Sequence, residues 1–182
     1  MSEKYKFYNP DDMYFITPTV IGWVDIFTKS RYCELILNSL RFCQHNKGLV
    51  IHAWVIMSNH LHLIVSKSSD LVLQDILRDF KRFTSIEIIK LINESSDSRK
   101  TWMLEIFSNA AANLKRVKDY KVWQDGNHPI ALCTTEEMDQ RLDYLHDNPV
   151  RAEIVNNQED YIYSSAIDYT GGKGLLNIDL LE

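Results

Sequence analysis

The feature that most constrains this chain is an apolar stretch at 54–65, WVIMSNHLHLIV, which one polar pair interrupts. Two apolar runs on either side of a two-residue break, Ser58-Asn59, are typical of a tight β-hairpin inside a core. Because the side chains of a strand alternate between its two faces, His60 and His62 point to the same side of the second strand. The sequence therefore predicts a pair of imidazoles on one face of a sheet.

Such a pair has two interpretations. Neutral imidazole is the commonest transition-metal ligand, and two imidazoles on one face can hold a divalent ion if a third ligand comes from elsewhere. Taken alone, however, a His-x-His in a strand is more often an ordinary pair of half-buried histidines. Only other residues of the chain can separate these interpretations.

The composition favours one globular domain. The chain has 182 residues, of which 45% are hydrophobic and 25% charged, which is enough for a well-filled core. We expect a single domain over 1–182, with a core at about 13–150 and a C-terminal tail at 151–182. No run of about 18 apolar residues is present and residues 1–4 open no secretory segment, so a cytoplasmic protein without a membrane span is expected. Cys33, Cys43 and Cys133 are odd in number and lack CxxC spacing, which indicates reduced thiols.

The formal net charge of -5 is unevenly distributed. Residues 76–122 carry ten Lys and Arg against six Asp and Glu, whereas residues 134–182 carry three against eleven. A basic segment in an acidic protein permits phosphate binding at one face, although such a segment is more often only a solvated surface.

The order of the expected elements defines a fold class. Aromatic and β-branched residues predict a strand over 13–20, and apolar periodicity predicts a helix over 30–46 that Gly48 closes. After the hairpin strands at 49–57 and 60–66, Asp70 is expected to cap a helix that extends to about 93. A further strand or short hairpin is expected around 121–132, whereas 102–107 and 109–120 give no clear prediction. This βαββαβ order predicts a ferredoxin-like α+β fold, in which helices cover one face of an antiparallel sheet and the other face is free to carry a site.

An added C-terminal helix is expected to supply the second half of that site. Thr134 and the carboxylates after it are typical of a helix start, and Pro149 predicts an end near Asp147. The apolar residues of this helix define a buried stripe from which Tyr144 is turned away. Asn148, four residues on, lies on the same side as Tyr144, whereas His146 projects in nearly the opposite direction.

Two motifs in this chain resemble those of a known family. The segment 58–65, SNHLHLIV, and the segment 144–152, YLHDNPVRA, are similar to the two signatures of the single-tyrosine HUH transposases, and more narrowly of the insertion-sequence-200-like proteins and their REP-associated tyrosine transposase relatives. Trp123-Gln124 and Tyr163-Ser164-Ser165 also match the REP-associated pattern. The resemblance spans roughly 14–169 with the order of the motifs intact.

The resemblance implies specific roles for residues of this chain. His60 and His62 match the paired metal-binding histidines, Tyr144 matches the nucleophile, and Asn148 lies where many transposon relatives carry a glutamine that completes the metal site. Asn148 is one methylene shorter than that glutamine, and His146 is the alternative ligand. The expected cofactor is Mg²⁺ or Mn²⁺, and no nucleotide cofactor is expected. The implied reaction cleaves and rejoins single-stranded or hairpin DNA through a 5′-phosphotyrosine.

The sequence also suggests contacts and partners. The candidates for contact with the DNA backbone are basic residues of the second helix and of the segment after it: Arg78, Lys81, Arg82, Lys115, Arg116 and Lys118. The family resemblance further implies a possible homodimer. Two alternatives remain at this point: a non-catalytic module that binds structured single-stranded nucleic acid, and a metal-dependent hydrolase of small phosphoesters.

Overall fold

The computed structural model describes residues 7, 9, 12–112, 114 and 119–181. Its main elements are β1 (Met13–Ile16), α1 (Ser30–Lys47), β2 (Leu49–Ile56), β3 (Leu61–Lys67), α2 (Leu73–Asn93), α3 (Lys100–Ala111), β4 (Ile130–Leu132) and α4 (Thr135–Arg151). Three short helical turns complete the fold: η1 (Ile21–Trp23), η2 (Gln158–Asp160) and α5 (Ala166–Tyr169).

The four strands form one antiparallel sheet in the order β2-β3-β1-β4. β1 lies in the middle, where Tyr14 is paired with Val65 of β3 on one side and with Ala131 of β4 on the other. This order, with one helix between β1 and β2 and others between β3 and β4, is the ferredoxin-like α+β fold that the sequence predicts.

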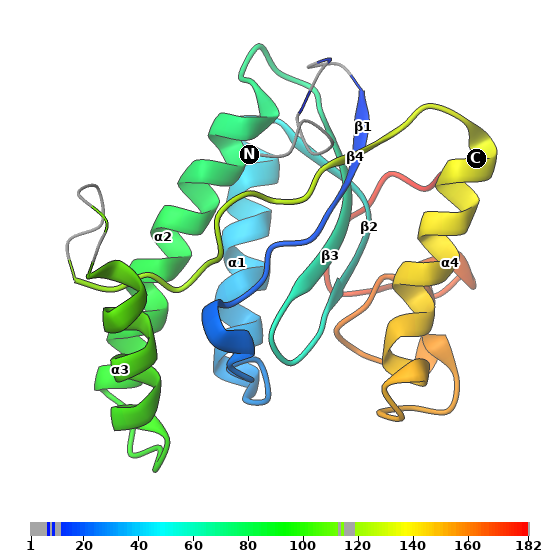
Figure 1. The fold of residues 1–182 in the computed structure, drawn as a ribbon. Coiled ribbons are helices and arrows are strands. Elements are labelled where there is room, and N and C mark those ends of the chain that lie inside the picture. Colours follow the sequence, from blue (N-terminus) through cyan, green and yellow to red (C-terminus); the bar gives the residue numbers. More distant parts are fainter. Residues whose placement is uncertain (1–6, 8, 10–11, 113, 115–118, 182) are drawn as a thin grey trace.

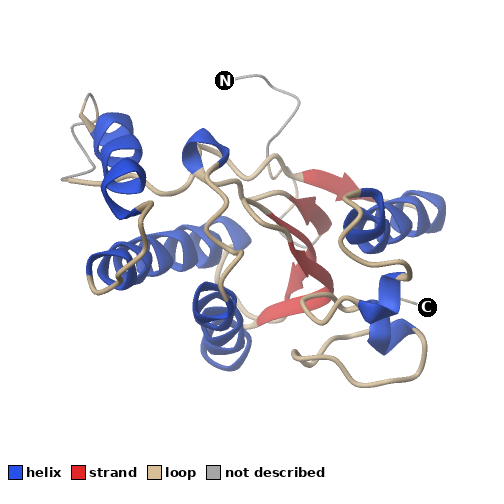
Figure 2. Ribbon diagram, turned by 90° about the horizontal axis from the view of Figure 1, so that it is seen from below, coloured by secondary structure: helices blue, strands red, loops and turns tan. Residues whose placement is uncertain are grey.

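The two faces of the sheet are covered by different helices (Figures 1 and 2). Alternation along β1 sends Tyr14 and Ile16 into the large core beneath α1 and α2, whereas Phe15 belongs to a smaller cluster on the opposite face. Leu145 of α4 is fully buried in that smaller cluster. The sequence predicts that this second face is free to carry a site. In the structure it is partly covered by α4, the helix that carries Tyr144.

Two helix termini follow the local capping rules that the sequence indicates. Gly48 closes α1 with φ 70°, and a Cβ there would lie 2.6 Å from the Cβ of Ser69, so glycine suits both the conformation and the space. Thr134 caps α4 in a capping box with Glu137, as predicted.

Several expected boundaries are wrong. α4 does not end near Asp147 but continues to Arg151, because Pro149 is buried against the fold and its missing amide costs only one bond in the last turn. Asp70 does not cap α2, whose N-cap is Val72. β1 ends at Ile16, and Thr19 and Val20 make only isolated bridges. In the part of the chain that the structure describes, no helix is long and apolar enough to cross a membrane.

Candidate active site

A groove of about 480 Å³ opens between β1, β3 and α4. Residues from four separate segments of the chain line it: Phe15, Thr17, Thr19, Trp23, His60, His62, Gln124, His128, Ile130, Arg141, Tyr144 and Asn148. The groove thus contains the two hairpin histidines together with the tyrosine and the asparagine of α4.

The two histidines lie side by side at the end of the hairpin. Their ring centroids are 4.7 Å apart, so the same-face prediction is confirmed. Nδ1 of His62 lies 2.9 Å from Oγ1 of Thr17, and Nδ1 of His60 lies 2.8 Å from Oδ1 of Asn59. Nε2 of His62 is buried and has no hydrogen-bond partner among the described residues. A buried imidazole nitrogen without a partner is the atom that a metal ion would satisfy.

Burial keeps both histidines neutral. It lowers the pKa of His60, and it lowers the pKa of His62 to about 3 with smaller contributions from His60 and the Arg141 guanidinium. At neutral pH each ring therefore keeps one nitrogen lone pair, which a metal ligand requires.

Tyr144 lies directly beside the pair. Its ring centroid is 5.4 Å from that of His62 and 6.1 Å from that of Phe15, and its side chain is 37% exposed. The next residue, Leu145, is fully buried beneath α4, which fixes the direction of the Tyr144 side chain. The phenol is therefore held at the groove but remains open to a ligand.

Asn148 and His146 project in opposite directions from α4. Nδ2 of Asn148 donates to the main-chain oxygen of Tyr144 at 2.7 Å, so its side-chain oxygen is the atom through which it can bind a cation. His146 is buried away from the groove, with Nε2 2.9 Å from Oγ of Ser165 and its ring packed against Tyr169. His146 is therefore not positioned to replace Asn148 as a ligand.

Helix α2, which carries three of the basic candidates, lies on the other side of the sheet from α4 (Figure 1). Arg78 is exposed and paired with Asp75, and Arg82 is exposed. Lys81 donates to the main-chain oxygens of Gln124 and Gly126 at 2.8 and 2.7 Å, and burial lowers its pKa to about 8. Lys81 thus ties α2 to the segment that precedes β4. Three further candidates lie outside the described residues: Lys115, Arg116 and Lys118.

The sequence analysis missed two residues at the groove. Arg141 precedes Tyr144 by one helical turn, and its guanidinium carbon lies 5.3 Å from the ring centroid of Phe15. Its i, i+3 spacing from Tyr144 could have indicated it, but Arg141 lies in a strongly acidic segment, which does not predict a phosphate contact. Trp23 is 60% exposed, adopts φ 54° and packs edge-on to His60 at 6.1 Å. No pattern in the sequence indicated that this tryptophan would be exposed.

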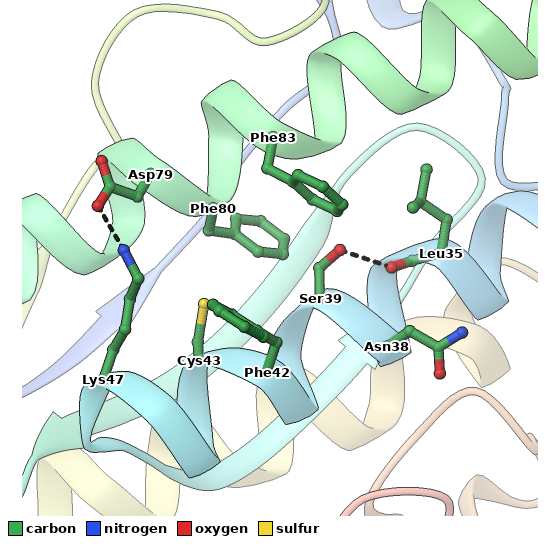
Figure 3. Close-up of a pocket in the computed structure, with 9 residues that line it drawn as sticks. All are labelled: Leu35, Asn38, Ser39, Phe42, Cys43, Lys47, Asp79, Phe80 and Phe83. Atoms are coloured by element: carbon green, nitrogen blue, oxygen red, sulfur yellow. Dashed lines mark hydrogen bonds and ion pairs between the residues drawn. The ribbon is translucent and has the colours of Figure 1, made fainter.

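A second cavity, of about 440 Å³, lies between α1 and α2 (Figure 3). Its walls are mainly apolar, with Phe42 and Phe83 more than half-exposed and a Lys47–Asp79 ion pair at one end. Burial raises the pKa of the Cys43 thiol to about 11, so its sulfur is not a thiolate at neutral pH. The groove beside α4 is therefore the better candidate for chemistry.

Comparison with known proteins agrees with the fold. A structure of a REP-associated tyrosine transposase bound to a REP hairpin superposes with a TM-score of 0.66 and 18% identity, and covers 100% of this chain and 94% of its own. A structure of a putative transposase from Deinococcus radiodurans R1 has a TM-score of 0.41 and 13% identity over 81% of this chain and 97% of its own. The search of curated proteins gave no match.

The family itself is shown by sequence. A family model described as "Transposase IS200 like" matches residues 24–120, which is more than half of the chain. The chain therefore belongs to the IS200-like transposase family. The matched segment contains His60 and His62 but stops before Tyr144.

Proposed function

We propose that this protein cleaves and rejoins single-stranded or hairpin DNA, with Tyr144 as the nucleophile and a divalent metal ion held by His60 and His62. The observation that carries the proposal is the meeting of the Tyr144 and His62 rings, 5.4 Å apart, at a groove where Nε2 of His62 lacks a partner among the described residues. A small-molecule phosphoesterase has no need of a tyrosine at this place.

The donor set suits a hard divalent ion. Within the described residues, no cluster of three or more His, Cys, Asp and Glu side chains is present, so a closed structural zinc site is not supported there. Two neutral imidazoles and the side-chain oxygen of Asn148 would instead leave positions open for water and phosphate oxygens, which favours Mg²⁺ or Mn²⁺. When bound, such an ion supplies Lewis-acid polarisation of the scissile phosphate.

The residues of the chain perform the group transfer. The Tyr144 oxygen attacks phosphorus, the bond from phosphorus to the DNA 3′-oxygen breaks, and the phenol proton ends on the released 3′-hydroxyl. The product is a 5′-phosphotyrosine, and attack by another 3′-hydroxyl reverses the step and joins a new strand. Arg141 lies where its guanidinium can neutralise charge on the phosphate oxygens.

The groove also has features that suit a single strand. Trp23 presents an exposed indole beside His60, and successive bases stack on such aromatic faces without sequence preference. The structural neighbour with a TM-score of 0.66 was solved with a hairpin, which supports DNA as the substrate class here. Because Tyr144 and His62 of the same chain meet, the reaction would need no residue from a partner subunit, even in the homodimer that the family resemblance implies.

The decisive experiment is a search for the covalent adduct. The full chain with Mn²⁺ is incubated with a pool of hairpin oligonucleotides that carry randomised single-stranded flanks and a label at the 3′ end, since the proposed adduct retains the 3′ fragment. A labelled protein band that resists denaturation is expected. Tyr144→Phe should abolish this band while hairpin retention stays within about twofold, whereas Tyr163→Phe serves as the matched control and should form it. An adduct that persists in Tyr144→Phe overturns the nucleophile assignment.

The same experiment distinguishes the proposed enzyme from the main alternative, a non-catalytic module that binds nucleic acid. A non-catalytic binder would retain the hairpin equally well in EDTA and would give no adduct with any variant.

A further inference from the structure

Asn59, at the tip of the hairpin, connects His60 to the loop that follows η1. Its Nδ2 donates to Oδ1 of Asp25 at 2.8 Å and to the main-chain oxygen of Trp23 at 3.4 Å. Its Oδ1 lies 2.8 Å from Nδ1 of His60. One side-chain amide therefore links a carboxylate to an imidazole.

The chemistry of these three groups determines which atom donates in each hydrogen bond. An ionised carboxylate only accepts hydrogen bonds, and so does the Trp23 carbonyl, so the amide nitrogen has to face them. The amide oxygen consequently faces His60, and because that oxygen also only accepts, Nδ1 of His60 has to carry the proton. Nε2 of His60 is then left with the lone pair that a metal ligand needs.

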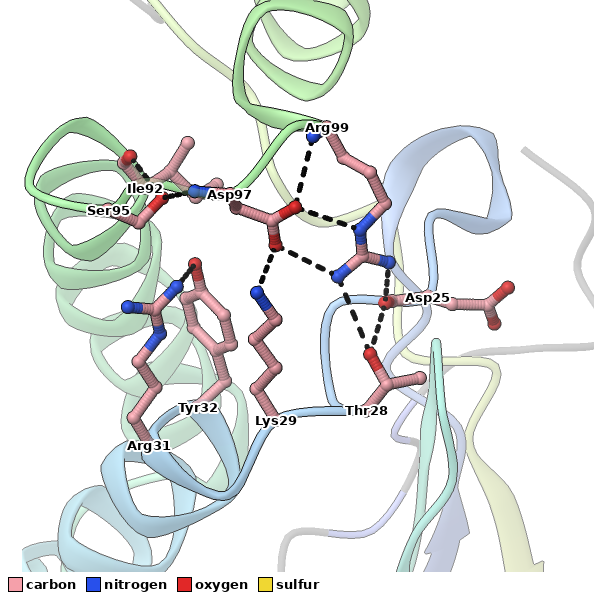
Figure 4. A network of polar contacts seen from close by, with 9 residues as sticks. All are labelled: Asp25, Thr28, Lys29, Arg31, Tyr32, Ile92, Ser95, Asp97 and Arg99. Atoms are coloured by element: carbon pink, nitrogen blue, oxygen red, sulfur yellow. Dashed lines mark hydrogen bonds and ion pairs between the residues drawn. The ribbon is translucent and has the colours of Figure 1, made fainter.

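Asp25 is itself held by a polar network (Figure 4). Arg99 donates from Nη1 to the main-chain oxygen of Asp25 at 2.9 Å, and the Asp97 carboxylate binds Arg99 at 3.1 Å and Lys29 at 2.8 Å. Hydrogen bonds from Arg99 and Lys29 hold the pKa of Asp97 well below its usual range, so the Asp97 carboxylate stays ionised at neutral pH. Figure 4 shows the Asp25 carboxylate pointing away from Arg99, which leaves it available to Asn59.

We propose that Asp25 and Asn59 are positioning residues that hold His60 in its Nδ1–H tautomer, with Nε2 directed to the metal ion. The inference rests on the proposed function, since it gives His60 a metal to bind. The assignment of the tautomer does not depend on that metal, because the order of donors and acceptors from Asp25 to His60 allows only one tautomer. His62 is held differently, through Thr17.

The first test measures Mn²⁺ binding to the full chain without DNA, from the electron paramagnetic resonance signal of free Mn²⁺. Asn59→Ala should weaken binding by about 10- to 100-fold, as the loss of such an outer hydrogen bond typically does. Asn59→Asp should also weaken it, because two carboxylates would then face each other across 2.8 Å. The double variant Asp25→Asn, Asn59→Asp exchanges the amide and the carboxylate, so that the carboxylate at 59 accepts from the amide at 25 and from Nδ1–H of His60, and it should recover most of the affinity. This rescue separates positioning from misfolding.

A matched control comes from elsewhere on the surface. Asn157 makes the same kind of bond, from Nδ2 to Oδ2 of Asp160 at 2.8 Å, but does not line the groove. Asn157→Ala should leave Mn²⁺ binding unchanged.

The second test reads the tautomer directly in the metal-free protein. Nitrogen-15 NMR of the His60 ring should show the proton on Nδ1 in the wild type and in the double variant, and a shift of the population towards Nε2–H in Asn59→Ala. If the wild type binds no Mn²⁺, the proposed metal function fails while the NMR result still decides the tautomer. If Asn59→Ala binds Mn²⁺ as the wild type does and keeps the proton on Nδ1, the inference is overturned.

Discussion

The ring of Tyr144 lies edge-on to the ring of His62, with ring centroids 5.4 Å apart and an interplanar angle of 69°. One residue comes from an inner strand and the other from the last long helix, so only the packing of α4 onto the sheet brings them together.

Loss of an imidazole should remove the metal site. His62→Ala should abolish measurable Mn²⁺ binding and the covalent adduct while hairpin retention persists, because DNA contact does not depend on one ligand. Isothermal titration with Mn²⁺ provides the measurement. The exposed His45 of α1 supplies the control, His45→Ala, and equal loss in both variants would rule out a specific site.

Asn148 should contribute less to metal binding than either histidine. Asn148→Ala is expected to weaken Mn²⁺ binding measurably without abolishing it, since a neutral side-chain oxygen is readily replaced by water. Asn148→Gln, which restores an amide with one more methylene, should bind more tightly than Asn148→Ala. Equal affinities of wild type and Asn148→Ala would remove Asn148 from the ligand set.

An exposed tryptophan at the groove should contact bases. Trp23→Ala should weaken binding of a single-stranded oligonucleotide by about 1–3 kcal/mol, the usual contribution of one stacked base, and Trp23→Phe should retain most of the affinity. Fluorescence anisotropy with a labelled oligonucleotide measures this change. Trp102 of α3 is 50% exposed and does not line the groove, so Trp102→Ala is the matched control.

Much of this fold could be predicted because local signals agreed with tertiary structure. The hairpin, Gly48 at the end of α1 and Thr134 at the start of α4 each have a backbone or capping requirement that sequence makes visible. α3 was not predicted because its exposed Trp102 and its neighbours give a weak amphipathic pattern. The end of α4 was misjudged because burial of Pro149 outweighs its local preference.

The site could be predicted only in part. Alternation and helical spacing place His60, His62, Tyr144 and Asn148, and the structure brings all four to one groove. The role of Asn59 depends on Asp25, which approaches it only through a loop fixed by Arg99, and no spacing rule connects these residues. Trp23 is exposed because its loop turns through two successive residues with positive φ, Gly22 and Trp23, which the composition did not indicate.

The packing of α4 against the sheet should contribute measurably to the free energy of unfolding. Leu145 is fully buried in the cluster with Phe15, Val55 and Ile64, so Leu145→Ala should lower the free energy of unfolding by about 2–5 kcal/mol. Urea denaturation measures the change. Leu180 is 52% exposed, and Leu180→Ala should cost much less. Similar costs in both variants would mean that α4 is not held by this cluster.

Stability should fall as the pH drops below neutrality. Burial lowers the pKa of His60, His62 and His146 from 6.5, to about 3 for His62 and about 4 for His146. Above pH 6.5 these rings are neutral in both states and have no effect. Between about pH 6.5 and 4 the unfolded chain binds protons that the native state does not, so the free energy of unfolding decreases by up to about 1.4 kcal/mol per pH unit for each histidine.

A substitution of His146 tests this dependence of stability on pH without changing a residue of the groove. His146→Gln keeps a group that can bond Ser165 but cannot titrate, so its free energy of unfolding should decrease less steeply between pH 6.5 and 5 than that of the wild type. Urea denaturation at pH 7, 6 and 5 in the presence of EDTA measures both slopes, in a range above the pH at which carboxylates protonate. Identical slopes for the two proteins would show that His146 accepts a proton in the native state as readily as in the unfolded chain, contrary to its burial between Ser165 and Tyr169.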